Sequence, residues 1–196
     1  MKTPQLVMVD AAWNRAHNAC YYDSRLQALY DRPMSGMEVA TRIDGPWWNV
    51  PARDRIWVII RLFPRLQLNE WLARLVERAL GRTKHPDARS LAVAGALRAN
   101  TIALGILEDS LRAYDMARAD NSSYIAATAY NAARVILYDA LAAYADVAYV
   151  ASSYATFAAN SYDDTTDAIA EASLTAERNQ QISDAVEILQ SPVWAE

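Results

Sequence analysis

The chain is poor in the residues that staple small secreted proteins or cradle phosphate. It has one cysteine, two histidines and five glycines among 196 residues. A lone cysteine, Cys20, cannot close an internal disulfide, and with no signal sequence near the start we expect a cytoplasmic protein. No apolar run reaches the roughly 20 residues of a membrane-spanning helix, so we expect no membrane partner. The scattered glycines exclude a phosphate-binding loop, and no nucleophile elbow is present.

Catalytic and metal-ligating groups are equally sparse. His17 and Cys20 would share a helix face and offer two ligands, but a structural zinc ion takes four. Cys20 stands next to Tyr21 and is expected to be a small buried hydrophobic residue. The acidic pairs along the later helices are explained by solvated helix faces and helix starts. We therefore expect no enzyme, no metal and no cofactor.

Helix breakers fall unevenly along the chain. Before Pro86 they recur often and predict short helices, among them one that opens on a Ser35–Glu38 capping box and an amphipathic one over 68–80. After Pro86 alanine accumulates, and no glycine or proline stands between 106 and 191. Alanine favours long helices, which we predict over 87–119, 124–159 and 165–189, the first either straight or bent near Gly95 or Asn100. We also predict that 52–63 is helical, although its β-branched run leaves a strand as the minor alternative.

These patterns predict an all-α fold, a helical bundle of long alanine- and tyrosine-rich helices with a smaller N-terminal helical part. We place the change of character at 85/86. Residues 1–85 would form a short-helix part that becomes basic toward its end, and residues 86–196 the bundle. The two parts are expected to pack as one unit.

Charge is divided along the chain. Residues 53–98 carry ten Lys and Arg against four Asp and Glu, whereas residues 99–196 carry four against fourteen. The basic segment either docks on the acidic helices or forms an anion- or partner-binding surface. The arginine-rich surface of the second reading would consist of Arg53, Arg55, Arg61, Arg65, Arg82, Lys84 and Arg89.

Two other groups of residues are candidates for a site. The predicted helix over 124–159 carries only Arg134, Asp139 and Asp146 as charges, and we expect either a structural ion pair across the bundle or a buried polar cluster. Four tryptophans, at 47, 48, 57 and 71, are candidates for stacking on a base, although the spacing of Trp57 and Trp71 also fits a helical core.

Several segments carry a resemblance to a known family. They are Asp54–Trp57 at the start of an apolar helix, the helix of Trp71 that ends in Glu77–Leu80, the junction His85–Ala92, the alanine and aromatic helices, and Ala176–Ile182. Over about residues 51–190 the chain resembles an alanine-rich helical immunity protein family of bacteria and phages. The resemblance implies a non-catalytic inhibitor or antidote that works by binding.

We therefore predict a non-catalytic helical binding protein, encoded by a phage or mobile element, that inhibits a host defence or toxin protein by occluding its surface. Its acidic half would complement a basic partner. The alternative is a sponge for a nucleotide-like or phosphorylated signal, enclosed by arginines of the basic segment and tyrosines of the later helices.

Two further expectations concern assembly and nucleic acid. General DNA binding is disfavoured because the chain is acidic, with a pI near 5.2. A long helix with three charges is hard to cover inside a small monomer, so we expect a homo-oligomer.

Overall fold

The computed structural model describes residues 7–83, 86–101, 104–117, 123–134, 141–160 and 167–191, and the side chains at 141–144, 160 and 167–170 are outside that description. The protein is all-α. Its elements are α1 (Ala11–Ala16), α2 (Asp23–Leu29), α3 (Gly36–Thr41), the 3-10 helix η1 (Gly45–Asn49), α4 (Ala52–Ile59), α5 (Arg65–Leu80), α6 (Ala88–Ala99), α7 (Leu104–Ala117), α8 (Ser123–Arg134), α9 (Leu141–Asn160) and α10 (Asp167–Gln190).

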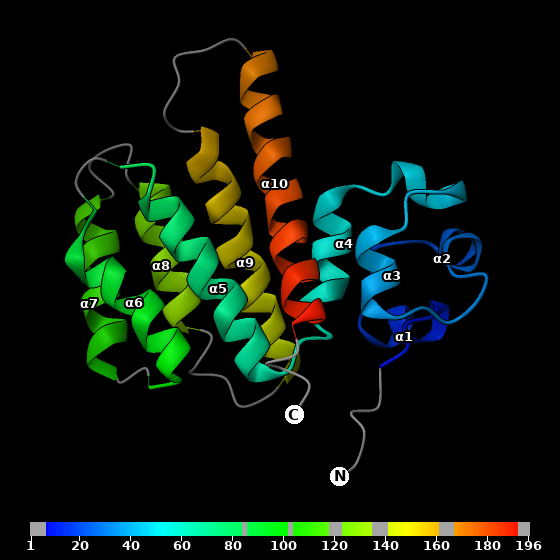
Figure 1. Cartoon of the computed structure of the whole chain (residues 1–196), viewed down its shortest axis with the longest axis horizontal. Coiled ribbons are helices and arrows are strands. Elements are labelled where there is room, and N and C mark those ends of the chain that lie inside the picture. The colour runs from blue at the N-terminus through cyan, green and yellow to red at the C-terminus, as the bar shows by residue number, and fades with distance from the viewer. Residues whose placement is uncertain are drawn as a thin grey trace.

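The long helices form a bundle with the short helices at one end (Figure 1). α5 packs on α6, α8, α9 and α10, and α10 also contacts α3 and α4. Buried hydrophobic residues from both parts of the chain belong to one core cluster. The compositional change near Pro86 therefore does not divide the protein into two separately packed parts, because α5, which precedes Pro86, lies within the bundle.

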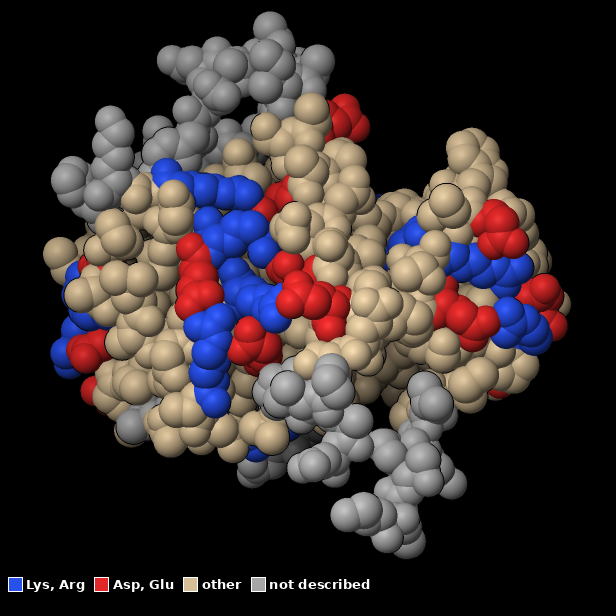
Figure 2. All heavy atoms as spheres, viewed as in Figure 1, with Lys and Arg blue, Asp and Glu red and all other residues tan. Residues whose placement is uncertain are grey.

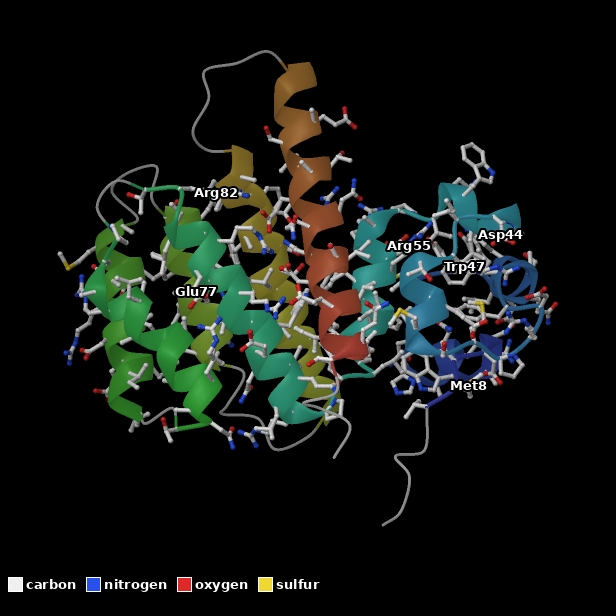
Figure 3. All side chains as sticks on the ribbon, viewed as in Figure 1. Met8, Asp44, Trp47, Arg55, Glu77 and Arg82 are labelled. Carbon is white, nitrogen blue, oxygen red and sulfur yellow. The ribbon has the colours of Figure 1, made fainter. Side chains whose placement is uncertain are left out.

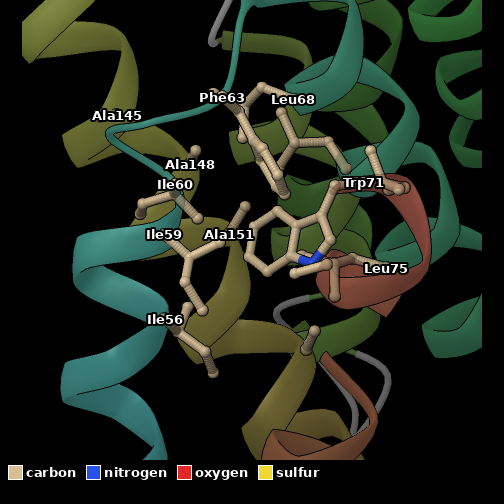
Figure 4. Close-up of a cluster of buried hydrophobic side chains, with 14 of the residues drawn as sticks. Ile56, Ile59, Ile60, Phe63, Leu68, Trp71, Leu75, Ala145, Ala148 and Ala151 are labelled. Carbon is tan, nitrogen blue, oxygen red and sulfur yellow. The ribbon is translucent and has the colours of Figure 1, made fainter. Parts of the chain in front are cut away.

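The centre of this core surrounds Trp71 of α5 (Figure 4). Trp71 is buried, packs near Phe63 and donates its indole N–H to the Gln181 carbonyl of α10 at 3.0 Å. Because that bond satisfies the only polar atom of the ring, the side chain can be fully buried. The predicted amphipathic helix over 68–80 is confirmed as part of α5, and Trp71 is a core residue.

The strand alternative over 56–60 is wrong, because the segment belongs to α4 and its C-cap, with Ile56 and Ile59 buried against the bundle. α4 ends at Ile59, four residues before the predicted end at Phe63. β-branched residues favour a strand by propensity, but burial of one helical face against the bundle stabilises the helix here.

The helix predicted over 124–159 is wrong. α8 and α9 occupy that range as two helices that pack closely against each other. Small side chains bring them together, and the buried ones on α9 recur every three or four residues, at Ala145, Ala148, Ala151, Ala155 and Ala158. Because each helix covers the other, the low charge of this segment no longer requires a second subunit, and the homo-oligomer stays a prediction.

The helix predicted over 87–119 is also divided. Asp87 caps α6 as expected, its side chain accepting the Arg89 amide, but α6 ends at Ala99. The next residue, Asn100, adopts φ 50° and ψ 38°, a left-handed conformation that asparagine tolerates better than most residues. The Asn69 side chain of α5 donates to the Asn100 side chain at 3.1 Å and holds this turn against the bundle.

The Ser35–Glu38 capping box at the start of α3 is confirmed. The Glu38 carboxylate accepts from Arg32 at 2.6 Å and from the Ser35 amide at 2.8 Å. The Arg32 hydrogen bond, followed by that of the Ser35 amide, lowers the pKa of Glu38 to about 2.

The Glu38 pKa predicts an acid-dependent loss of stability. A carboxyl whose pKa is lower in the folded protein contributes stability above its unfolded pKa of about 4.3, and that contribution is lost as the pH falls through the folded pKa. We expect Glu38→Gln to be less stable than wild type at pH 7, and the difference to shrink between about pH 4.5 and 2. Urea unfolding at stepped pH measures both. A difference that stays constant down to pH 2 would contradict the assignment.

Candidate functional site

Arg55 is a structural cation and not part of a basic surface. Its side chain is buried beneath η1, where Nη2 donates to the Trp47 carbonyl at 2.6 Å and Nε to the Val50 carbonyl at 3.3 Å (Figure 3). Burial lowers the pKa of Arg55. The prediction that Arg55 lines an anion-binding surface is wrong, because its side chain is buried and donates to the carbonyls of Trp47 and Val50.

Arg61 is likewise enclosed. Its guanidinium stacks on the Trp57 ring at 3.8 Å and forms an ion pair with Asp146 of α9. Burial lowers the pKa of Arg61, and the charge of Asp146 partly opposes that shift. Arg61 therefore fastens the end of α4 to α9, which corrects its assignment to the basic surface.

Arg82 belongs to an ion-pair network that joins α5 to α10. Its Nη2 donates to Glu177 at 2.5 Å, and the same carboxylate accepts from Arg78 at 3.0 Å. Arg78 also pairs with Asp184 at 2.5 Å. Figure 2 shows the result on the surface, where basic and acidic side chains interleave over these two helices. The basic segment thus docks on the acidic helices, the first of the two readings of the charge pattern.

The other predicted arginines lie apart from one another. Arg53 on α4 has an exposed side chain (61%) and its Nε lies 3.3 Å from Asp54. Arg65 is exposed at the start of α5, and Arg89 pairs with Asp87 of its own helix at 2.6 Å. Lys84 lies outside the described residues. The six positions that the structure describes do not form one basic surface.

Two of the three candidate polar residues of the later helices, Arg134 and Asp146, are described. Arg134 ends α8, where it donates to Asn131 at 3.2 Å and lies over the Tyr130 ring. Asp146, on α9, has a side chain that is 67% exposed, and its described partner is Arg61. Asp139 lies outside the described residues. An ion pair across the bundle is confirmed for Asp146, with Arg61 as its described partner, and the prediction that Asp146 belongs to a buried cluster is wrong.

The hollow best suited to a ligand lies where the short helices meet α4 and α9. Its volume is about 180 Å³, and five of its twelve lining residues are aromatic. The rings come from distant parts of the chain and are those of Tyr21, Tyr30, Trp47, Trp57 and Tyr149. The lining also includes one carboxylate, that of Asp54. We call this hollow the aromatic pocket. An apolar cavity of about 150 Å³ holds a benzene ring, so the aromatic pocket has room for a flat ring of that order.

Asp54 is the charged group of the aromatic pocket. One carboxylate oxygen accepts from the Tyr21 hydroxyl, and the Tyr21 ring carries the Arg25 guanidinium at 4.3 Å. Burial, reinforced by the hydrogen bond to Asp54, raises the pKa of Tyr21 to about 12. Tyr21 therefore stays protonated at neutral pH and holds the carboxylate in place, where Asp54 can accept from an N–H group of a ligand.

Hydrogen bonds and a ring contact hold Trp47 and Tyr30 in place on another wall of the aromatic pocket. The Trp47 indole donates to the Leu29 carbonyl at 2.7 Å and meets Tyr30 edge to face at 5.2 Å. Burial raises the pKa of Tyr30 to about 12. The Arg55 bonds hold the backbone of Trp47 and Val50, so this buried arginine shapes the pocket from behind.

Cys20 also lines the aromatic pocket and its side chain is exposed, which corrects the expectation of a buried cysteine. Since the short loop between α1 and α2 carries it, the residue stands at the mouth of the pocket. It is the only cysteine of the chain and hence a unique chemical handle on the mouth.

Part of this site could be predicted from the sequence. Trp47 and Trp57, two of the four stacking candidates, line the aromatic pocket, whereas Trp71 is in the core and Trp48 is exposed. Tyr21 and Asp54 were not predicted, and Tyr149 was expected only as one of the tyrosines of the later helices that would enclose a ligand. Their spacing has no local period, and only the tertiary fold brings Tyr21 and Tyr149 to the side of α4 that carries Asp54.

Two searches of the described residues found nothing. No group of three or more His, Cys, Asp or Glu side chains there is placed to hold a metal ion. Among the helices of the described ranges, none is both long and apolar enough for a membrane crossing. Comparisons with protein-family models, with curated proteins and with solved structures found no match, so the resemblance to the immunity proteins stays a prediction.

Proposed function

We propose that this protein is a non-catalytic binding protein that captures a small aromatic molecule in the aromatic pocket. The observation that carries the proposal is the pocket itself, a preformed hollow with rings on several sides and a single oriented carboxylate. Ligand sites are typically concave and mostly apolar, with a few placed polar groups that fix orientation. The proposal follows the small-molecule alternative raised by the sequence.

The charge distribution favours this proposal over occlusion of a basic partner. Three acidic groups of α10, which belongs to the acidic half of the chain, are paired with arginines of α5; they are Glu177, Asp184 and Glu187. Neutralised charges attract a partner weakly. A small molecule enclosed by the rings needs no such field.

Stacking on Trp57 tests the proposal. We expect a panel of nucleosides, titrated by calorimetry, to contain at least one ligand, and Trp57→Ala to weaken its binding by about 5- to 150-fold, the effect of losing one stacked ring worth about 1 to 3 kcal/mol. Trp48→Ala is the matched control, because Trp48 is 74% exposed and does not line the pocket. Equal affinity of the two variants, with unchanged circular dichroism, would refute capture by the pocket.

A partner protein remains the second candidate because of one surface feature. Ile43 precedes η1 and Trp48 lies within it, and both are largely exposed. An exposed tryptophan of this kind is a typical anchor at protein interfaces. The same two variants separate the candidates. A protein that co-purifies with wild type and Trp57→Ala but is lost from Trp48→Ala would favour the surface over the pocket.

A further inference from the structure

A second hollow of about 180 Å³ shares a wall with the aromatic pocket. Tyr149 lines both, and the consecutive residues Arg53 and Asp54 of α4 line one each. The polar side chains of the second hollow are Arg53, Tyr149, Ser152, Ser153, Thr156 and Arg178, and its lining includes no carboxylate. We call it the arginine hollow.

Arg178 is the distinctive cation of the arginine hollow. It extends from α10, is half-buried, and has no carboxylate or hydrogen-bond partner within the described ranges. Its neighbour Glu177 does not neutralise it, because that carboxylate is engaged by Arg78 and Arg82. A half-buried guanidinium without a counter-charge is an unusual arrangement in a chain whose other buried arginines are bonded, and an anionic ligand would complete it.

Arg53 faces the same hollow from α4. Only its Nε contacts Asp54, at 3.3 Å, so the two terminal nitrogens are available for a bidentate contact with an anion. Burial raises the pKa of Tyr149, with a further contribution from Asp54, while Arg53 and Arg178 act in the opposite direction. The Tyr149 hydroxyl therefore remains a proton donor at neutral pH between the two guanidinium groups.

The hydroxyl groups of α9 in the arginine hollow can act as hydrogen-bond acceptors, unlike the two arginines. Ser153 donates to the Tyr149 carbonyl at 3.1 Å, Thr156 donates to the Ser152 carbonyl at 3.0 Å, and Ser152 donates to the Gln181 side chain at 2.5 Å. With their protons committed, the Ser152 and Ser153 oxygens offer lone pairs to hydroxyl groups of a ligand, whereas the Thr156 oxygen already accepts from the Gln181 side-chain N–H at 3.2 Å. The hollow thus combines donors suited to an anion with acceptors suited to a sugar.

We propose that the captured molecule is a nucleoside phosphate, with its base in the aromatic pocket and its phosphate between Arg53 and Arg178. This inference rests on the proposed function and names the ligand class of the same site. Each hollow alone is smaller than the roughly 300 to 1,000 Å³ of most small-molecule sites, whereas a ligand that spans Tyr149 uses both. Asp54 then accepts from a ring or exocyclic N–H, and the phosphate pairs with the two arginines.

The test compares four nucleosides, adenosine, guanosine, cytidine and uridine, with their 5′-monophosphates by calorimetry. For at least one base we expect the monophosphate to bind at least tenfold more tightly than the nucleoside. Arg178→Gln and Arg53→Gln should each weaken monophosphate binding by about 10- to 150-fold, the range for a hydrogen bond to a charged group, and leave nucleoside affinity unchanged. Arg112→Gln is the matched control, since Arg112 is an exposed arginine of α7.

The possible results are distinguishable. Equal affinity for nucleoside and monophosphate, with no effect of Arg178→Gln, overturns the phosphate site but leaves the aromatic pocket. Binding of monophosphates that Trp57→Ala does not weaken overturns the proposed function while a phosphate site survives. No binding by any of the eight compounds overturns both. Inorganic phosphate provides a second readout, because it should compete with the monophosphate and not with the nucleoside, and melting curves establish that each variant is folded.

Discussion

Glu177→Gln should lower the free energy of unfolding by about 3 kcal/mol. The Glu177 side chain is 2% exposed and accepts from both Arg78 and Arg82. Removing its charge leaves two guanidinium groups between α5 and α10 with less compensation, and breaking a buried pair in this way costs about 3 to 5 kcal/mol. The lower figure applies because both arginines are partly exposed. One nitrogen of each arginine is already buried without a partner among the described residues, so the network has no spare acceptor.

The matched control is the same substitution ten residues later on α10. The Glu187 side chain pairs with Arg74 but is 70% exposed, so Glu187→Gln should cost less than about 1 kcal/mol. Urea unfolding followed by circular dichroism measures both variants. Equal losses would show that burial of the ion pairs does not determine how α5 and α10 are held together.

Arg55→Met should lower the free energy of unfolding by a similar amount, about 3 kcal/mol. Methionine keeps the length of the apolar stem but removes the donors that hold the Trp47 and Val50 carbonyls. Hydrogen bonds to a charged group contribute about 1.5 to 3 kcal/mol each. Part of this loss is offset, because folding of the variant no longer has to remove a cation from water.

Arg53→Met is the control, because Arg53 lies two residues away on the same helix and is exposed, and its effect on stability should stay within about 0.5 kcal/mol. Thermal and urea unfolding give the comparison. In the part of Arg55→Met that remains folded, ligand affinity should also fall, because η1 forms a wall of the aromatic pocket. An Arg55→Met protein as stable as wild type would contradict the structural role assigned to this arginine.

Features set by short-range chemistry could be predicted from the sequence. The Ser35–Glu38 capping box needs two side chains three residues apart, and the apolar face of α5 repeats with the helical period. The all-α class follows from the same patterns. None of these depends on which helices become neighbours.

The helix boundaries within the alanine-rich half could not be predicted. Nothing between 106 and 191 breaks a helix by its backbone, and alanine favours continuation. The chain nevertheless divides into α8 and α9, because two alanine faces pack closely when the helices lie side by side. Residues 135–140, between the two helices in the sequence, include neither glycine nor proline, so nothing there predicts a break.

The aromatic pocket required tertiary knowledge, although one local signal existed. Arg55 and Ile59 are four residues apart on α4, so an arginine on the apolar face of that helix could have been recognised as buried, and Arg53 as exposed. No comparable signal links Tyr21 to Asp54, which are 33 residues apart, or either of them to Tyr149.

The rate at which Cys20 reacts with N-ethylmaleimide tests capture by the aromatic pocket most directly. Cys20 is the only thiol, is exposed, and stands at the pocket mouth, so mass spectrometry reports occupancy of that one place. We predict that a saturating nucleoside 5′-monophosphate slows the reaction at least tenfold in wild type and has no such effect in Trp57→Ala at the same concentration. A bound monophosphate that leaves the Cys20 rate unchanged would contradict the account, because the ligand would then lie elsewhere.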